Sequence, residues 1–341
     1  MAVYIARRLL LLPVVAVGVT VLIFTLLQVL PPASRAMLFI QNPEQANAIA
    51  AIIRKYDLDK PMYVQYGHWI RDLVRGDLGY SQSARMPVAQ AIATFFPATL
   101  ELSLYAFVLI VVLGVALGTA AAVHRDGIID HISRILSICG YSLPVFVWGL
   151  LLLLIFYGFL QWFPPERLSL AAGLYAQSPA FHTFTGLITV DAVLNGAWWV
   201  LGDALRHLVL PVITLTYFLA ATLVRITRSA MLDALGQDYV RTARSKGLAE
   251  SRVIGRHARK NALIPVVTLS SSILIGLLGG VVITETIFNY PGIGRWGATA
   301  ALELDVPAVA GFALFAAALT VLVNLAADVL YCFVDPRIRL R

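Results

Sequence analysis

Residues 102–123 read LSLYAFVLIVVLGVALGTAAAV and contain no charged side chain. A helix of this length rises about 33 Å at about 1.5 Å per residue, which matches the hydrocarbon core of a bilayer. The whole chain of 341 residues is 59% hydrophobic and only 13% charged, whereas soluble proteins are about 25% charged. This composition excludes a water-soluble globule and predicts an all-α polytopic membrane protein.

Five other apolar tracts are long enough to cross a bilayer. The first follows Arg7 and Arg8 and extends to Ser34, which is longer than the apolar core of a cleaved signal peptide. The others lie at residues 135–163, 207–224, 261–284 and 306–327. A further tract at residues 168–190 contains polar side chains and two glycines. We therefore expect six transmembrane helices, with residues 168–202 forming an extracytoplasmic surface helix or loop.

The distribution of charge predicts the orientation of these helices. With both termini inside, the inner segments have a net charge of +9 and the outer segments a net charge of −2, which add to the +7 of the whole chain. A seventh span before Arg206 would instead place the most basic stretch, residues 225–260, outside. Because cytoplasmic segments are enriched in Lys and Arg, we expect both termini to be cytoplasmic.

The predicted spans divide the chain into three parts. Residues 1–34 hold the N-terminal tail and the first helix. Residues 35–97 carry seven basic and five acidic residues, which predicts a small extracytoplasmic subdomain after this helix. Residues 98–341 hold the other five helices, with a large cytoplasmic loop at residues 229–260.

Motifs for nucleotide or metal chemistry are missing or out of context. None of the four lysines follows a glycine, so there is no P-loop, and the six histidines form no HExxH pattern. Gly292, Gly294 and Gly297 match a GxGxxG pattern, but they follow a predicted span instead of a strand. We interpret them, with Pro291, as a tight turn at the outer surface. We expect no catalytic residue, metal or cofactor on this chain.

Small residues in the spans predict helix packing. Gly114 and Gly118 form a GxxxG pattern, which permits close approach of a neighbouring helix. Cys139 and Cys332 lie in apolar tracts without metal-ligand spacing, so we expect both to be small packing residues.

The inner loop is the most informative segment. Residues 238–248 read DYVRTARSKGL, and the following arginines Arg252, Arg256 and Arg259 share one face of a helix. This pattern predicts an amphipathic helical hairpin broken near Gly247. Such a hairpin either holds anionic lipid with its basic face or docks on another protein, and the periodicity alone leaves both open.

The same loop resembles the EAA loop of ABC-transporter permeases, in which a short helix ending in Ala-x-x-x-Gly docks on a cytoplasmic ATPase. Ala243 and Gly247 match this spacing, although Arg241-Thr242-Ala243 stands in place of Glu-Ala-Ala and proline follows later than in the general motif. With these departures, the loop is similar to that of the dipeptide/oligopeptide subfamily of permeases. The resemblance implies these ATPase-coupling residues: Asp238, Tyr239, Arg241, Thr242, Ala243, Arg244, Lys246 and Gly247.

Short motifs along nearly the whole chain resemble the same subfamily. They are Tyr4-Ile5-Ala6-Arg7-Arg8-Leu9, Leu58-Asp59-Lys60-Pro61, Gly76-Asp77-Leu78-Gly79, Ala98-Thr99-Leu100-Glu101-Leu102, Gly140-Tyr141-Ser142-Leu143-Pro144, Glu285-Thr286-Ile287-Phe288, Pro291-Gly292-Ile293-Gly294 and Asp335-Pro336-Arg337. Their order and spacing are most similar to the first permease of a dipeptide importer. The resemblance implies the fold of a type I ABC importer permease.

The resemblance also implies a function. The chain would form half of the translocation pathway of a bacterial ABC importer for di- and oligopeptides in the inner membrane. Its partners would be a second homologous permease, two ATPases that bind ATP and Mg, an extracytoplasmic peptide-binding protein and membrane lipid, but not nucleic acid. Similar permeases carry nickel, glutathione or antimicrobial peptides, so the substrate stays open.

An ion-coupled secondary transporter is the rival class. It is expected to have ionisable residues near the middle of the membrane and often an internal repeat, and the sequence shows neither. The few ionisable residues near the spans lie at their ends. Arg225 and Asp328 are predicted to form a structural pair at the inner side. Glu285 is expected either to be exposed at the outer interface or to line the pathway mouth with Pro291, Gly292 and Gly294.

Overall fold

The computed structural model describes residues 13–14, 17–22, 24–25, 28–29, 31–37, 49–55 and 57–334, without the side chains of residues 34, 37, 55, 141 and 327–334. The predicted first span, which ends at Ser34, lies partly outside these residues. The side chains of Asp328 and Cys332 also lie outside them, so the predictions for both stay predictions. The described part is mainly helical, with one two-stranded sheet.

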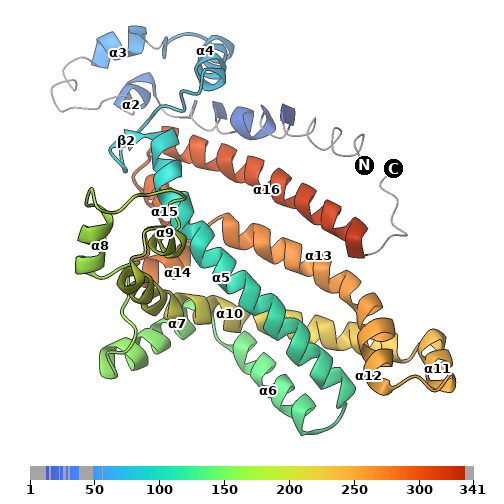
Figure 1. Cartoon of the computed structure of the whole chain (residues 1–341). Helices are drawn as coiled ribbons and strands as arrows, with labels where there is room; N and C mark the ends of the chain where they lie inside the picture. Colours follow the sequence, from blue (N-terminus) through green and yellow to red (C-terminus); the bar gives the residue numbers. More distant parts are fainter. Residues whose placement is uncertain are drawn as a thin grey trace.

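Four helical runs in the described part are long and apolar enough to cross a membrane. They are α5 (Val88–Val123), α10 (Trp198–Leu235), a continuous run of α12 (Glu250–Arg252), η3 (Val253–Ala258) and α13 (Arg259–Leu278), and α16 (Val306–Val334). Figure 1 shows α13 beside α16, with α5 and α10 crossing beneath them. These runs correspond to four of the six predicted spans, and the bent helix pair described below gives a fifth if it crosses the membrane as one span.

Helices α5 and α10 pack closely because two glycines leave room between them. A Cβ atom on Gly118 would lie 2.5 Å from Cβ of Thr227 and 2.8 Å from the carbonyl oxygen of Val224. A Cβ atom on Gly114 would lie 2.5 Å from a methyl carbon of Leu223. Real side chains do not pack at these distances, so the predicted close approach at the GxxxG pattern is confirmed.

The predicted span at residues 135–163 is bent. Helix α6 (Ile128–Ser142) ends at Leu143, and the chain bends by 96° before α7 (Val145–Leu153) and η2 (Leu154–Phe159). Leu143 is extended, with φ −112° and ψ 137°. Pro144 causes the break, because proline disfavours a helical conformation in the residue before it. Cys139 on α6 is exposed, so the prediction that it is a packing residue is wrong.

The fifth span is shorter than predicted. Helix α13 ends at Leu278 instead of Thr284, and α14 (Val282–Ile287) follows after a break at Gly279 and Gly280. Gly280 has φ +101°, which side chains rarely permit. The break turns the chain so that Glu285 lies on a separate short helix.

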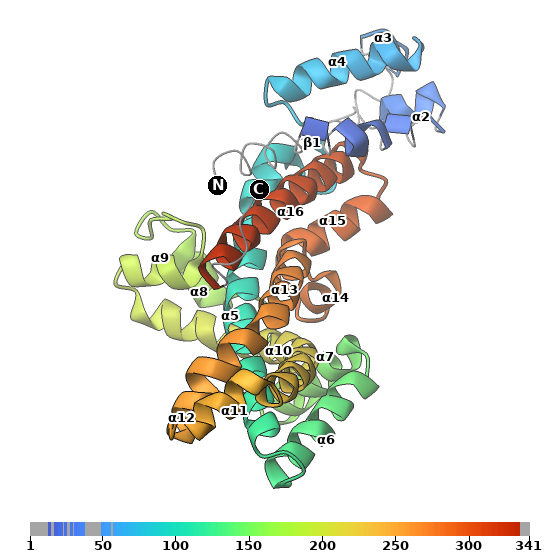
Figure 2. The same ribbon diagram turned by 90° about the vertical axis from the view of Figure 1, so that its right-hand side faces the viewer.

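The segments outside the long helices form small helical units. Helices α2 (Pro32–Met37), α3 (Ile49–Lys55) and α4 (Met62–Val74) lie together at one end of the molecule (Figures 1 and 2). Two short helices, α8 (Leu170–Ala176) and α9 (Ile188–Leu194), form much of the segment at residues 168–202.

The hairpin of β1 (Tyr80–Ser81) and β2 (Met86–Pro87) joins the first unit to the long helices. The hydroxyls of Ser81 and Ser83 donate to the buried carboxylate of Asp305 at 2.7 and 2.8 Å. Asp305 directly precedes α16. The boundary of a subdomain at residue 97 stays a prediction, since Pro97 lies inside α5.

Candidate functional site

The inner hairpin is formed by α11 (Asp238–Ser245) and the start of the run from Glu250. It lies at the opposite end of the molecule from α3 and α4 (Figures 1 and 2). Val240 and Ala243 are buried in a cluster with Met231 of α10 and Val253 of η3. The hairpin is therefore packed against both long helices that lead into the membrane.

The Ala-x-x-x-Gly spacing is explained by how α11 ends. Gly247 has φ +73°, its amide donates to the carbonyl of Arg244 at 2.9 Å, and the amide of Leu248 donates to the carbonyl of Ala243 at 3.4 Å. These two hydrogen bonds define a Schellman motif, with glycine at the left-handed position. Leu248 also packs against the cluster that contains Ala243. The motif fixes a tight turn between α11 and the next helix.

Seven of the eight predicted coupling residues are exposed. They are Asp238, Tyr239, Arg241, Thr242, Arg244, Lys246 and Gly247. Ala243 is instead buried, so it supports the hairpin from within. Arg244 donates two hydrogen bonds to Glu250, at 3.1 and 2.6 Å, and this ion pair closes the hairpin across the turn. The exposed face therefore has a defined shape and carries both signs of charge.

The helix after the turn separates basic and apolar faces as predicted. Arg252, Arg256 and Arg259 are exposed, whereas Val253 and Ala258 are buried. The two buried residues are five positions apart in the sequence. They share one face because Val253–Ala258 is a π-helical segment, in which the hydrogen bonds join residues five apart. This places both residues toward the cluster.

A second region, predicted from the sequence to lie at the outer side, centres on Glu285, which is fully buried. Its carboxylate accepts hydrogen bonds from the Thr99 hydroxyl at 2.7 Å and the Arg295 amide at 2.6 Å. Burial raises the pKa of Glu285, and these hydrogen bonds oppose the shift. The expectation that Glu285 is exposed at the interface is therefore wrong, because its carboxylate is satisfied inside the protein.

Gly292 and Gly294 make room for this carboxylate. A Cβ atom on Gly292 would lie 2.2 Å from the carboxyl carbon of Glu285, and one on Gly294 would lie 2.9 Å from a carboxylate oxygen. Gly292 caps the N-terminus of α15 (Ile293–Leu302), where a negative charge is favourable. The turn at the GxGxxG pattern thus accommodates the Glu285 carboxylate of this chain, instead of the phosphate of a bound dinucleotide. Of the four residues predicted at the mouth, Pro291 alone is exposed.

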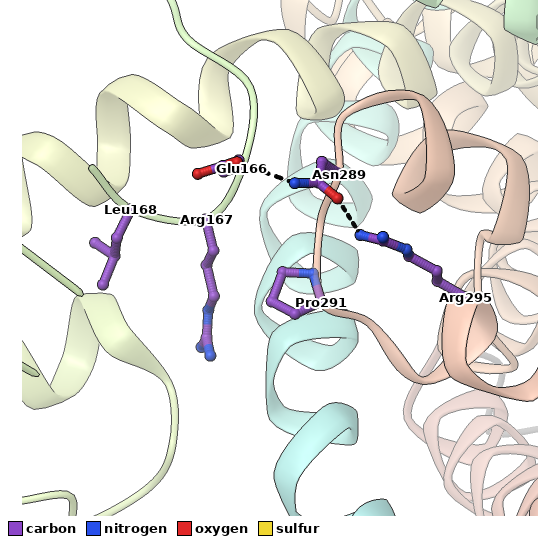
Figure 3. A pocket seen from close by; sticks show the side chains of 6 residues that line it. All are labelled: Glu166, Arg167, Leu168, Asn289, Pro291 and Arg295. Atoms are coloured by element: carbon purple, nitrogen blue, oxygen red, sulfur yellow. Dashed lines mark hydrogen bonds between the residues drawn. The ribbon is translucent and has the colours of Figure 1, made fainter. Parts of the chain in front are cut away.

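An open hollow of about 360 Å³ lies beside Pro291 (Figure 3). Its lining residues come from the loop after η2, from the segment joining α14 to α15 and from the first turn of α15. They are Glu166, Arg167, Leu168, Asn289, Pro291 and Arg295. Helix α10 holds the first loop, because His207 Nδ1 donates to the Pro165 carbonyl at 2.7 Å and Arg206 donates to the Gln161 carbonyl at 3.0 Å. The hollow therefore joins two segments that are far apart in sequence.

Arg167 is neutralised by a buried carboxylate on α5. It donates to Glu101 at 2.7 and 3.1 Å and to the Gly186 carbonyl at 2.8 Å. The other oxygen of Glu101 accepts the amide and hydroxyl of Thr189, at 2.7 and 2.8 Å. Glu101 thus links α5 to the loop that holds Arg167 and to the start of α9 at Thr189. Its signal in the sequence is a single acid at the start of an uncharged span.

Two family profiles together cover almost the whole chain. Residues 110–340 match the family described as binding-protein-dependent transport system inner membrane component, and residues 1–103 match the N-terminal region of membrane components of such systems. The chain belongs to this family. It is an inner-membrane permease, and the resemblance to ABC-transporter permeases is confirmed.

Curated permeases are similar over the full length. The chain is 42% identical over 337 residues to the di/tripeptide transport system permease protein DppB of Pseudomonas aeruginosa, covering 98% of each chain. It is 39% identical over 337 residues to the dipeptide transport system permease protein DppB of Escherichia coli K12, again with 98% of each covered. It is 34% identical over 339 residues to the oligopeptide transport system permease protein AppB of Bacillus subtilis, with 99% of each covered.

A second charged cluster of this permease was missed by the sequence analysis. Asp130 on α6 is fully buried and accepts two hydrogen bonds from Arg228 of α10, at 2.6 and 2.7 Å. Arg134 donates to the same carboxylate at 2.9 Å. Asp130 and Arg134 are four residues apart, a spacing typical of helical ion pairs. The distant partner Arg228 has no comparable signal.

Proposed function

We propose that this permease forms half of the translocation pathway of a bacterial ABC importer for di- and oligopeptides. The observation that carries the proposal is its similarity, over 98% of its length, to permeases named for di/tripeptide and dipeptide transport. The chain supplies no covalent chemistry. Nickel, glutathione and antimicrobial peptides remain alternative cargoes, and identifying the ligand of the co-purified binding protein distinguishes them from peptides.

The proposed complex contains a second homologous permease, two ATPases that hold ATP and Mg, and an extracytoplasmic peptide-binding protein. The exposed face of α11 is proposed to contact an ATPase through Tyr239, Arg241, Thr242 and the turn at Gly247. Support comes from the defined shape of this face and from the burial of Ala243 beneath it. We also propose that the chain has six transmembrane helices and that both of its termini lie in the cytoplasm.

The mechanism we propose is alternating access driven by the ATPases. Closure of the ATPases around ATP would displace α11. Because Val240 and Ala243 pack against Met231 of α10 and Val253 of η3, the displacement would pass to the α10 helix and the Glu250–Leu278 run together. Hydrolysis would then return the complex to its resting conformation.

Vesicles that hold the complete complex should take up dipeptide only with ATP and binding protein, and Gly247→Leu should lower this uptake about fivefold to thirtyfold. The left-handed conformation of Gly247 costs a residue with a side chain about 1–2 kcal/mol, which changes a population by about this factor. A Cβ atom at Gly247 meets no atom of this chain within 4 Å, so abundance should be near normal. Radiolabelled dipeptide uptake and stimulated ATP hydrolysis measure the effect.

Gly247→Asn is the matched control, since asparagine tolerates the left-handed conformation better than leucine. It should retain most of the uptake. Normal uptake by Gly247→Leu at normal abundance would rule out docking and favour a lipid-binding hairpin. Uptake by vesicles that contain only this chain and a proton gradient would establish the secondary transporter instead.

The orientation predicts opposite labelling of two exposed positions. In a background without Cys139 and Cys332, Arg75→Cys should react with a membrane-impermeant thiol reagent in spheroplasts. Ser245→Cys should react only after permeabilisation. Arg75 ends α4, whereas Ser245 ends α11, and the charge distribution places them on opposite sides. Mass-tag labelling on gels reads the result, and reaction of both from outside would refute the six-helix topology.

A further inference from the structure

The hollow beside Pro291 is lined by two polar residues, one of them charged, whose backbone has a positive φ angle. Glu166 has φ +75° and Asn289 has φ +50°. A glutamate rarely adopts such an angle, and it does so mainly where the surrounding structure enforces it, whereas asparagine adopts it more readily. Here the Glu166 amide donates to the Phe288 carbonyl at 2.6 Å, which joins the two segments directly. The positions of both residues at the hollow are therefore enforced.

Asn289 lies between a carboxylate and a guanidinium. Its amide nitrogen donates to Glu166 at 3.0 Å, and its amide oxygen accepts from Arg295 (Figure 3). A carboxylate offers about four acceptor sites and a guanidinium five N–H donors. The Asn289 amide occupies only a few of these acceptor sites and donors. Both groups keep capacity for a further ligand.

Two charged groups of opposite sign line the hollow besides Arg167. Arg167 is already neutralised by Glu101, which leaves the Glu166 carboxylate and the Arg295 guanidinium. Arg295 is fixed at its base, because its amide donates to the buried Glu285. The Asn289 amide bridges the Glu166 carboxylate and the Arg295 guanidinium through two hydrogen bonds. The distance that this bridge spans is comparable to the length of two extended residues, roughly 7 Å.

We propose that this hollow binds the two charged ends of a short peptide, with Arg295 holding the carboxylate and Glu166 the ammonium group. The proposal rests on the proposed function as a peptide importer and names the termini as what is recognised at the outer mouth. Guanidinium and carboxylate groups form charge-assisted hydrogen bonds with the opposite charge. A volume of about 360 Å³ lies at the lower end for small-molecule sites, which suits a dipeptide better than a long peptide.

The test measures binding of radiolabelled dialanine to the purified complete transporter without its binding protein, which removes the selectivity of that protein. Glu166→Gln should weaken dialanine binding at least about tenfold, because a hydrogen bond between charged groups is replaced by a neutral one, but leave N-acetyl-dialanine unchanged. Arg295→Gln should weaken dialanine binding similarly but leave dialanine amide unchanged. Glutamine can still hydrogen-bond Asn289 in both variants.

Glu303→Gln and Arg75→Gln are matched controls at exposed positions, and both should bind dialanine as the wild type does. Equal losses for free and blocked peptides, or no dialanine binding by the wild type, would overturn the proposal. Weaker capture of the binding protein by both variants, with unchanged dialanine binding, would assign the hollow to protein docking and also overturn it. ATP-driven dipeptide uptake by the wild-type system tests the proposed function separately, because uptake can persist without this subsite.

Discussion

Replacement of Gly118 by leucine should lower the ratio of folded to unfolded permease by about a hundredfold. The new Cβ atom would lie 2.5 Å from Thr227 and 2.8 Å from the carbonyl oxygen of Val224. Backbone cannot rotate away as a side chain can, so α5 and α10 must separate. Overpacking costs about 1–3 kcal/mol, and we expect the upper end, which corresponds to about a hundredfold.

The effect is measured as the amount of detergent-resistant complex and its apparent Tm. Ala116→Leu is the matched control, because Ala116 is exposed and lies two residues away on the same helix. This control should be near wild type in both measurements. Equal behaviour of the two variants would mean that the α5–α10 contact is not as close as the structure places it.

Arg167→Met should destabilise the permease by about 3–5 kcal/mol, because it leaves the carboxylate of Glu101 buried without its charged partner. Glu101 is 1% exposed and Arg167 is 17% exposed, so water screens this pair little. Methionine is of similar length but donates no hydrogen bond. The loss should appear as a lower apparent Tm and a lower yield of folded complex.

The double variant Glu101→Gln with Arg167→Met separates the charge effect from the loss of packing. Glutamine still offers an oxygen to Thr189, and no buried charge remains. We expect the double variant to recover most of the stability lost by Arg167→Met, as a double-mutant cycle would reveal. A double variant less stable than either single change would show that the pair is not coupled in this way.

Local features of the fold followed from the sequence. The uncharged tracts located the long helices because a span needs about 20 apolar residues. Gly114 and Gly118 indicated a close helix contact, and the pattern around Gly247 indicated the hairpin. The bend before Pro144 and the break at Gly280 have local signals too, but the continuous apolar character of both tracts concealed them.

Contacts between distant segments did not follow from the sequence. Glu101 pairs with Arg167, 66 residues later, and Asp130 pairs with Arg228, 98 residues later. No periodicity connects such positions. Glu285 was expected at the surface because it follows an apolar tract, whereas the turn at Gly280 brings it beneath α15. The hollow between Glu166 and Arg295 was missed for the same reason.

The long helix α10 has a mechanical consequence. Its outer part is tied to the loop before Glu166 through Arg206 and His207, and its inner end leads into the hairpin of α11. Pro211 lies inside the helix, four residues after His207, and cannot donate a hydrogen bond to the His207 carbonyl. The helix is about 57 Å long, and the part beyond Pro211, about 36 Å, forms a lever that is clamped next to its pivot. A small tilt at the pivot becomes a large displacement at the end of α10 that leads into α11.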